Sequence, residues 1–126
     1  MKAKIIKLSG KVVDVEVEDY KDMQKAVDGF IERLPVEEKH GVTVYCNEEG
    51  RVHELPINMT ACMWLLRNGM YPSMDYPIHG EVLVLGLPDE EGSDTDVPEE
   101  LMIQELWVEP SFEIFTGDEA KEMMGF

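Results

Sequence analysis

Four polar residues in the middle of the chain have residue types that could form a small binding site: Asn47, Glu48, Glu49 and Asn58. Carboxylate and amide oxygens can bind a cation, and amide N–H groups can bind an anion. A hairpin tip and a helix N-terminus often lie at one edge of a sheet, which would bring these side chains together. We favour the structural alternative, in which Asn47 shapes a turn, Asn58 caps a helix and the glutamates are solvated.

A second candidate site follows from the uneven distribution of charge. Residues 1–67 carry 12 Asp/Glu against 10 Lys/Arg, a net charge of −2, whereas residues 68–126 carry 15 against the single Lys121, a net charge of −14. A field of this density attracts a basic partner, although acidity can also serve only solubility. The residues proposed to bind that partner, called the acidic segment below, are Asp89, Glu90, Glu91, Asp94, Asp96, Glu99 and Glu100.

Other kinds of chemistry find little support in the sequence. The serines lack a nucleophile-elbow context, and there is no phosphate-binding glycine loop. His40, His53, His79 and Cys46 do not have the short paired spacing of zinc ligands. We therefore expect no enzymatic activity, no metal and no cofactor. Direct nucleic-acid binding is not expected either, because it rests mainly on Lys/Arg contacts with phosphate.

The two cysteines and the N-terminus indicate the cellular compartment in which the protein is found. Cys46 and Cys62 lie in a strand-like and a helix-like segment, which favours buried thiols over a disulfide and so a reducing cytoplasm. The N-terminal apolar run is too short for a signal peptide, and no stretch approaches the ~20 apolar residues of a membrane span. We expect a cytoplasmic protein without a membrane partner.

Apolar periodicity predicts the elements of the first half. Residues 5–6 and 13–17 predict two strands that pair through a turn at Ser9 and Gly10. A helix should begin after the cap Asp19 and end at Gly29. Strands are predicted at 30–34 and 42–46, and the Asn-Glu-Glu-Gly tetrad at 47–50 predicts a hairpin tip.

The second half should contain a helix, a central strand and an acidic extension. Asn58 is predicted to cap a helix at 59–68 that Gly69 closes, and the apolar run 81–86 predicts a strand buried on both faces. Residues 88–96 are predicted to form a linker or an exposed loop. Asp96, with Glu99 three residues later, predicts a helix through about Trp107, and Thr116 a short final helix.

Together these elements predict a single α+β domain. We expect a mixed or largely antiparallel sheet of about five strands, two core helices and an acidic C-terminal helical extension. The predicted boundaries are a core at 1–87, an acidic loop at 88–97 and an extension at 98–126 that packs on or next to the core.

Several short strings agree in order and spacing with a known family. They are VDGFIE at 27–32, YCNEEG at 45–50, LPIN at 55–58 and IHGEVLVLG at 78–86. Over about residues 3–87 the chain resembles a family of small uncharacterised proteins, of unknown function, found in phages, plasmids, conjugative elements and some bacterial genomes. The chain departs from the family pattern at Asp28, where a second glycine is common, and in the acidic extension after Pro88, which does not align with the family. The resemblance implies a mobile-element setting and no particular chemistry.

The leading functional hypothesis is therefore a small, acidic, non-enzymatic binding protein of a phage or mobile element. In its sharper form, the acidic segment imitates nucleic acid and inhibits a basic host nucleic-acid-binding or defence protein. One alternative is a structural module that homo-oligomerises through a strand edge or through the methionines and aromatic residues of the tail. Another is a small-ligand-binding accessory domain.

Overall fold

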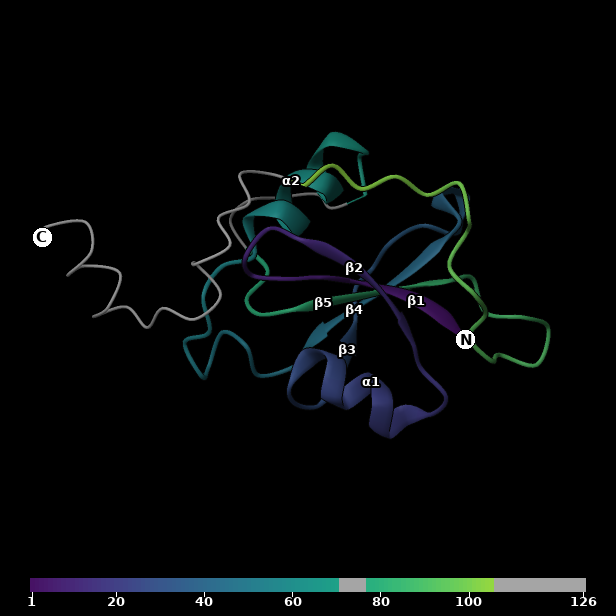
Figure 1. Cartoon of the computed structure of the whole chain (residues 1–126), viewed down its shortest axis with the longest axis horizontal. Helices are drawn as coiled ribbons and strands as arrows, with labels where there is room; N and C mark the ends of the chain where they lie inside the picture. Colours follow the sequence, from purple (N-terminus) through teal and green to yellow (C-terminus); the bar gives the residue numbers. More distant parts are fainter. Residues whose placement is uncertain (71–76, 106–126) are drawn as a thin grey trace, which may run out of the picture.

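The chain begins with the hairpin that the sequence predicts. In the computed structural model, which describes residues 1–70 and 77–105, β1 (Lys2–Ile6) pairs antiparallel with β2 (Val12–Glu16) (Figure 1). Ile5 lies opposite Val13, and Gly10 takes a φ of 97° in the turn, a conformation that residues with a side chain rarely adopt.

Three further strands complete a sheet in the order β2-β1-β5-β4-β3. They are β3 (Ile31–Arg33), β4 (Val42–Asn47) and β5 (Val82–Gly86), and a short 3₁₀ turn, η1 (Glu38–His40), precedes β4. Every neighbouring pair is antiparallel, and Val84 of β5 lies opposite both Lys4 and Val44. For the part of the chain that it describes, the structure confirms an α+β domain with a five-stranded antiparallel sheet and β5 at its centre.

Among the described residues, the sheet has one helix on each face, α1 (Tyr20–Val27) and α2 (Met59–Arg67) (Figure 1). Alternate residues of β5 point to opposite faces: Val82 and Val84 pack in the core under α2, and Leu83 and Leu85 pack in the core under α1. This alternation explains why β5 reads as a continuous apolar run, since both of its faces are buried.

The start of α1 follows the prediction, and its end does not. The Asp19 side chain caps the helix by accepting a hydrogen bond from the Asp22 N–H at 3.0 Å. The left-handed residue at the other end is Asp28, with a φ of 58°, and not Gly29. Gly29 is small for another reason: a Cβ there would lie 2.5 Å from the amide nitrogen of Asn47. The prediction missed this because only the folded chain brings Asn47 there.

The predicted hairpin tip at 47–50 is wrong, since residues 48–54 form no strand and the next strand that pairs with β4 is the distant β5. Residues 48–54 form successive turns instead, in which the His53 N–H donates to the Glu49 carbonyl at 2.9 Å. A single bridge then pairs Ile57 with His79. Gly50 contributes by lacking a side chain, because a Cβ would lie 2.7 Å from the His79 carbonyl oxygen. Close packing against residues 78–80 therefore overrides the local hairpin preference.

The predicted helix from Asp96 is also absent across residues 97–105. The Asp96 carboxylate accepts a hydrogen bond from the Lys2 N–H at 2.8 Å, so it does not cap a helix. The Val97 N–H donates to the Lys2 carbonyl at 2.8 Å, and the Val97 side chain is buried in the core under α2. Pairing with β1 thus replaces helix formation. The rest of this helix and the one predicted from Thr116 lie outside the described residues.

Candidate functional site

The acidic segment begins in a tight loop that one of its own aspartates shapes. The Asp89 carboxylate accepts hydrogen bonds from the N–H groups of Glu91 and Ser93, at 2.9 and 3.0 Å. The Asp89 N–H donates to the Ser93 carbonyl at 2.8 Å. Such bonds from an aspartate to the following backbone stabilise a turn. Asp89 therefore fixes the loop that displays Glu90 and Glu91, both of which are exposed.

The same loop is held against the sheet. The Tyr45 hydroxyl of β4 lies 3.0 Å from each carboxylate oxygen of Asp94. The Gly86 N–H donates to the Thr95 carbonyl at 2.9 Å, and the Thr95 hydroxyl donates to the Leu87 carbonyl at 2.7 Å. Figure 1 shows this loop in green, projecting beside the N-terminus. The loop is thus docked on the core at these contacts, whereas the sequence left both a linker and an exposed loop open.

Residues 97–105 continue across the α2 face of the sheet to reach the helix itself (Figure 1). Leu101 and Ile103 pack against the core there. The Glu105 carboxylate accepts from the Val12 N–H at 2.8 Å, and Arg67 donates to the Gln104 side-chain oxygen at 2.8 Å. Contacts with β1, β2 and α2 therefore hold the backbone on both sides of Glu99 and Glu100.

Four glutamates of the acidic segment differ from its three aspartates. Asp89, Asp94 and Asp96 accept hydrogen bonds that hold the fold. The four glutamate side chains are exposed and make no hydrogen bond or ion pair within residues 1–70 and 77–105. We call them the free glutamates: Glu90, Glu91, Glu99 and Glu100.

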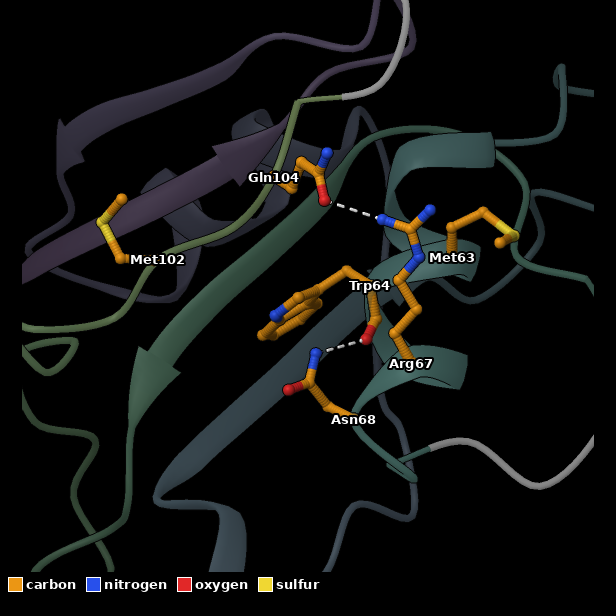
Figure 2. A pocket seen from close by; sticks show the side chains of 6 residues that line it. All are labelled: Met63, Trp64, Arg67, Asn68, Met102 and Gln104. Atoms are coloured by element: carbon orange, nitrogen blue, oxygen red, sulfur yellow. Dashed lines mark hydrogen bonds between the residues drawn. The ribbon is translucent and has the colours of Figure 1, made fainter.

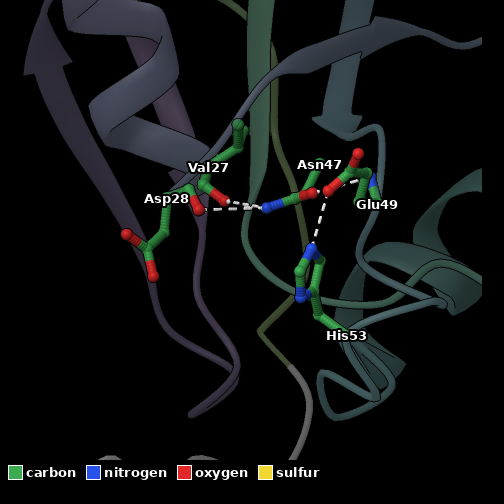
Figure 3. Close-up of polar contacts among 5 residues, drawn as sticks. All are labelled: Val27, Asp28, Asn47, Glu49 and His53. Atoms are coloured by element: carbon green, nitrogen blue, oxygen red, sulfur yellow. Dashed lines mark hydrogen bonds and ion pairs between the residues drawn. The ribbon is translucent and has the colours of Figure 1, made fainter.

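Asn47 of the predicted polar site holds two elements together (Figure 3). Its amide nitrogen donates to the carbonyls of Val27 and Asp28, each at 3.1 Å, and its oxygen accepts from the Glu49 N–H at 2.8 Å. Glu49 in turn contacts the His53 ring at 2.6 Å, and both side chains are exposed. Glu48 is exposed as well. Asn47 therefore joins the end of α1 to the end of β4.

Asn58 lies in a different place and is fully buried. Its amide nitrogen donates to the carbonyls of Ile6 and Gly80, at 2.8 and 3.0 Å. Its oxygen accepts from the Ala61 N–H at 3.0 Å, which is the predicted helix cap. The structure therefore brings Asn47 and Glu49 together, whereas the amide of Asn58 points into the core between α2, β1 and residue 80.

A small cleft of about 200 Å³ separates α2 from the segment that crosses it (Figure 2). Trp64, Arg67 and Asn68 line it from the helix, and Met102 and Gln104 from the other side. The Arg67–Gln104 hydrogen bond spans this cleft, and the Asn68 amide donates to the Trp64 carbonyl at 2.7 Å. These polar groups use one another as partners, so the cleft adds little capacity for a ligand.

Three ionisable groups of the core have raised pKa values. Burial raises the pKa of the Cys46 thiol to about 12, with a smaller contribution from Glu32, and burial also raises the pKa of Cys62. Burial together with the Asp94 carboxylate raises the pKa of Tyr45 to about 12. Across the described residues, no group of three or more His, Cys, Asp or Glu side chains is placed to hold a metal ion.

Tyr45 is the functional candidate that the sequence did not single out. Strand alternation placed it on the opposite face from Val44, but the pattern could not show that its hydroxyl meets Asp94, which is 49 residues away. A tyrosine on the face of β4 that the sequence predicted to be only partly covered was the available signal.

The comparisons with known proteins bear on this acidic segment. A family model described as a domain of unknown function (DUF3846) matches residues 1–109. The chain belongs to this family. The match confirms the expectation of a family without an assigned function, and it extends past residue 87 to include the whole acidic segment. The segment is therefore part of the DUF3846 domain in this chain. No curated protein and no solved structure matches the chain.

One further observation concerns membranes. Among the helices of the described residues, none is both long and apolar enough to cross a bilayer.

Proposed function

We propose that this chain is a non-enzymatic binding protein whose free glutamates dock on a basic surface of a partner protein. The observation that supports the proposal is that the aspartates and the glutamates of the acidic segment have different roles. Its three aspartates fix the backbone, and its four glutamates are exposed and unpaired on that backbone within the described residues.

Local charge favours this function. Residues 77–105 contain nine Asp/Glu and no Lys or Arg, so the segment has no internal basic partner in its own sequence. Because the backbone that displays these carboxylates is already ordered, binding to lysine or arginine does not carry the entropic cost of ordering a loop. The same field steers a basic protein toward the site and raises its association rate at low salt.

The sharper form of the proposal is nucleic-acid mimicry. A surface of Lys and Arg that binds phosphates also accepts carboxylates that are displayed in sufficient number. A mobile-element protein of this kind would occupy the nucleic-acid site of a host nucleic-acid-binding or defence protein and inhibit it. Support for this form comes from the charge and from the mobile-element setting that the sequence resemblance implies.

Affinity capture from a bacterial lysate tests both forms. The full chain is used as bait at low and at high salt, and bound proteins are identified by mass spectrometry. We expect enrichment of a basic, nucleic-acid-binding protein that high salt or added duplex DNA releases. Capture that resists salt would contradict the electrostatic proposal, and capture that salt releases but excess DNA does not would contradict mimicry alone.

Within the described residues no strand pairs with the outer edge of β3, which favours a second function, self-assembly. β3 is the last strand of the sheet, and Phe30 beside it is 58 % exposed. An unpaired strand edge with an apolar neighbour can pair with a second copy. Sedimentation analysis distinguishes this function, because an oligomer built on strand pairing persists at high salt.

A further inference from the structure

A pocket of about 590 Å³ lies beside the acidic segment, between the start of α1, β4 and the loop that contains Asp94. Its apolar and aromatic wall includes Met23, Ile31 and the ring of Tyr45, all of which pack in the core under α1. Glu18, Asp19 and Asp94 contribute carboxylates to the same lining. The pocket therefore combines an apolar, aromatic wall with negative charge.

The negative charge of this pocket is only partly used by the fold. Asp19 accepts the helix-capping bond from Asp22, and Asp94 accepts from Tyr45, but a carboxylate has about four acceptor positions. The Glu18 carboxylate makes no hydrogen bond or ion pair with any described residue. The only cation of the lining is the Met1 ammonium, which donates to the Val17 carbonyl at 2.7 Å and lies 3.7 Å from Glu16. Acceptor capacity therefore remains for an incoming cation.

The apolar wall and the negative charge of this pocket together favour one kind of side chain as a ligand. An apolar stem can pack against Met23 and Ile31 while a cationic head meets the carboxylates. Two tyrosines favour arginine over lysine: Tyr45 in the wall and Tyr20, which is 53 % exposed, beside the carboxylates. A guanidinium stacks on aromatic rings and binds carboxylates in a bidentate manner, which an ammonium does not.

We propose that this pocket receives an arginine side chain of the basic partner. The inference rests on the proposed function, because the partner surface that meets the neighbouring Glu90 and Glu91 would present the arginine. Asp94 links the two sites, since it belongs to the acidic segment and also lines the pocket.

The test uses two short blocked peptides of alternating residues, one of glycine and arginine and one of glycine and lysine. Each is titrated at low salt into the ¹⁵N-labelled full chain, followed by NMR. We expect the arginine peptide to shift the amide signals of Tyr45, Ser93 and Asp94, and the lysine peptide to bind several-fold more weakly there. Glu18→Gln should weaken arginine-peptide binding roughly two- to fivefold, as loss of an exposed charge pair does. Glu38→Gln, an exposed change on η1, should not.

The possible outcomes separate this inference from the proposed function. Equal shifts by both peptides confined to the free glutamates would overturn the arginine pocket and leave the proposed function standing. Unchanged affinity in Glu18→Gln would also overturn the pocket. No shift anywhere at low salt would contradict both proposals.

Discussion

Asn58 is a single residue whose structural role the sequence indicated only in part. Its cap on α2 was predictable, because asparagine before an apolar helical pattern is a strong N-cap signal. Its two other hydrogen bonds, to Ile6 and Gly80, were not, because both partners become neighbours only in the folded chain. The side-chain amide of Asn58 is fully buried and makes all three hydrogen bonds, so it links three segments of the chain.

Asn58→Ala should therefore lower the free energy of unfolding by about 2–4 kcal/mol, since it removes the cap and two further buried hydrogen bonds. Asn68→Ala is the matched control, because its amide makes one hydrogen bond at an exposed position, and it should cost less than about 1 kcal/mol. Urea unfolding followed by circular dichroism measures both. Equal losses in the two variants would contradict the role of Asn58.

The two thiols should be inert in the native chain. With the pKa of Cys46 raised to about 12, its thiolate is about a thousandfold scarcer near neutral pH than that of a free cysteine. Labelling with a thiol reagent, read by intact mass, should proceed at least a hundredfold more slowly in native protein than in concentrated guanidinium, on the order expected from that scarcity. Similar rates would show that the thiols are accessible and reactive.

The raised pKa of Cys46 also sets a direction for stability at alkaline pH. The folded thiol keeps its proton up to about pH 12, whereas the unfolded thiol loses it near 9.0. Its contribution is therefore complete below pH 9 and is lost as pH rises through this window. The free energy of unfolding of Cys46→Ala should fall less steeply over the same range, as alkaline urea titrations would show. Parallel curves would contradict the assignment.

Among the helices and strands, sequence patterns correctly predicted those whose formation depends on residues close together in the chain. The apolar run of β5 and the capped helix α2 were predictable, because their patterns depend on residues a few positions apart. The hairpin at 47–50 and the helix from Asp96 failed, because distant partners decide both. Asp96 has the residue type of a helix cap, but Lys2, 94 residues away, takes its hydrogen bond.

Docking of the acidic segment depends on Gly86 at the end of β5. A Cβ there would lie 2.5 Å from the Thr95 hydroxyl and would also collide with the Asp96 carbonyl. Gly86→Ala should therefore displace residues 95–97 from the sheet, and a glutamate-specific protease should cleave faster after Glu90 and Glu91.

Mass spectrometry of timed digests measures this cleavage. Ser93→Ala is the control on the same loop, since the loop bonds of Ser93 come from its backbone. Equal cleavage in Gly86→Ala and in wild type would show that the segment does not depend on this contact.

For the whole molecule, the free glutamates add charge that makes no hydrogen bond or ion pair within the described residues. The four free glutamates belong to a chain with a net charge of −16, so they repel the rest of the molecule. Such charge keeps a protein soluble, and it also attracts a basic partner to the surface that displays it. Sequence alone showed the charge, but which carboxylates hold the fold and which remain free required the structure.

A stability measurement checks this repulsion. Changing the four free glutamates to glutamine should raise the free energy of unfolding by up to about 1 kcal/mol at low salt, because repulsion is relieved. The gain should vanish at high salt, where the charges are screened. Urea titrations at two salt concentrations measure it. Destabilisation at low salt would show that these side chains support the fold.

The measurement that tests the central claim most directly compares two variants of equal net charge. One changes the free glutamates to glutamine. The other makes the same change at four exposed glutamates elsewhere, Glu37, Glu38, Glu48 and Glu54, so that each variant moves from −16 to −12. Both serve as baits beside the wild type in lysate capture, quantified by mass spectrometry. We expect the second variant to retain the basic partner of the wild type and the first to lose it. Equal retention or equal loss would show that net charge, and not this surface, determines binding.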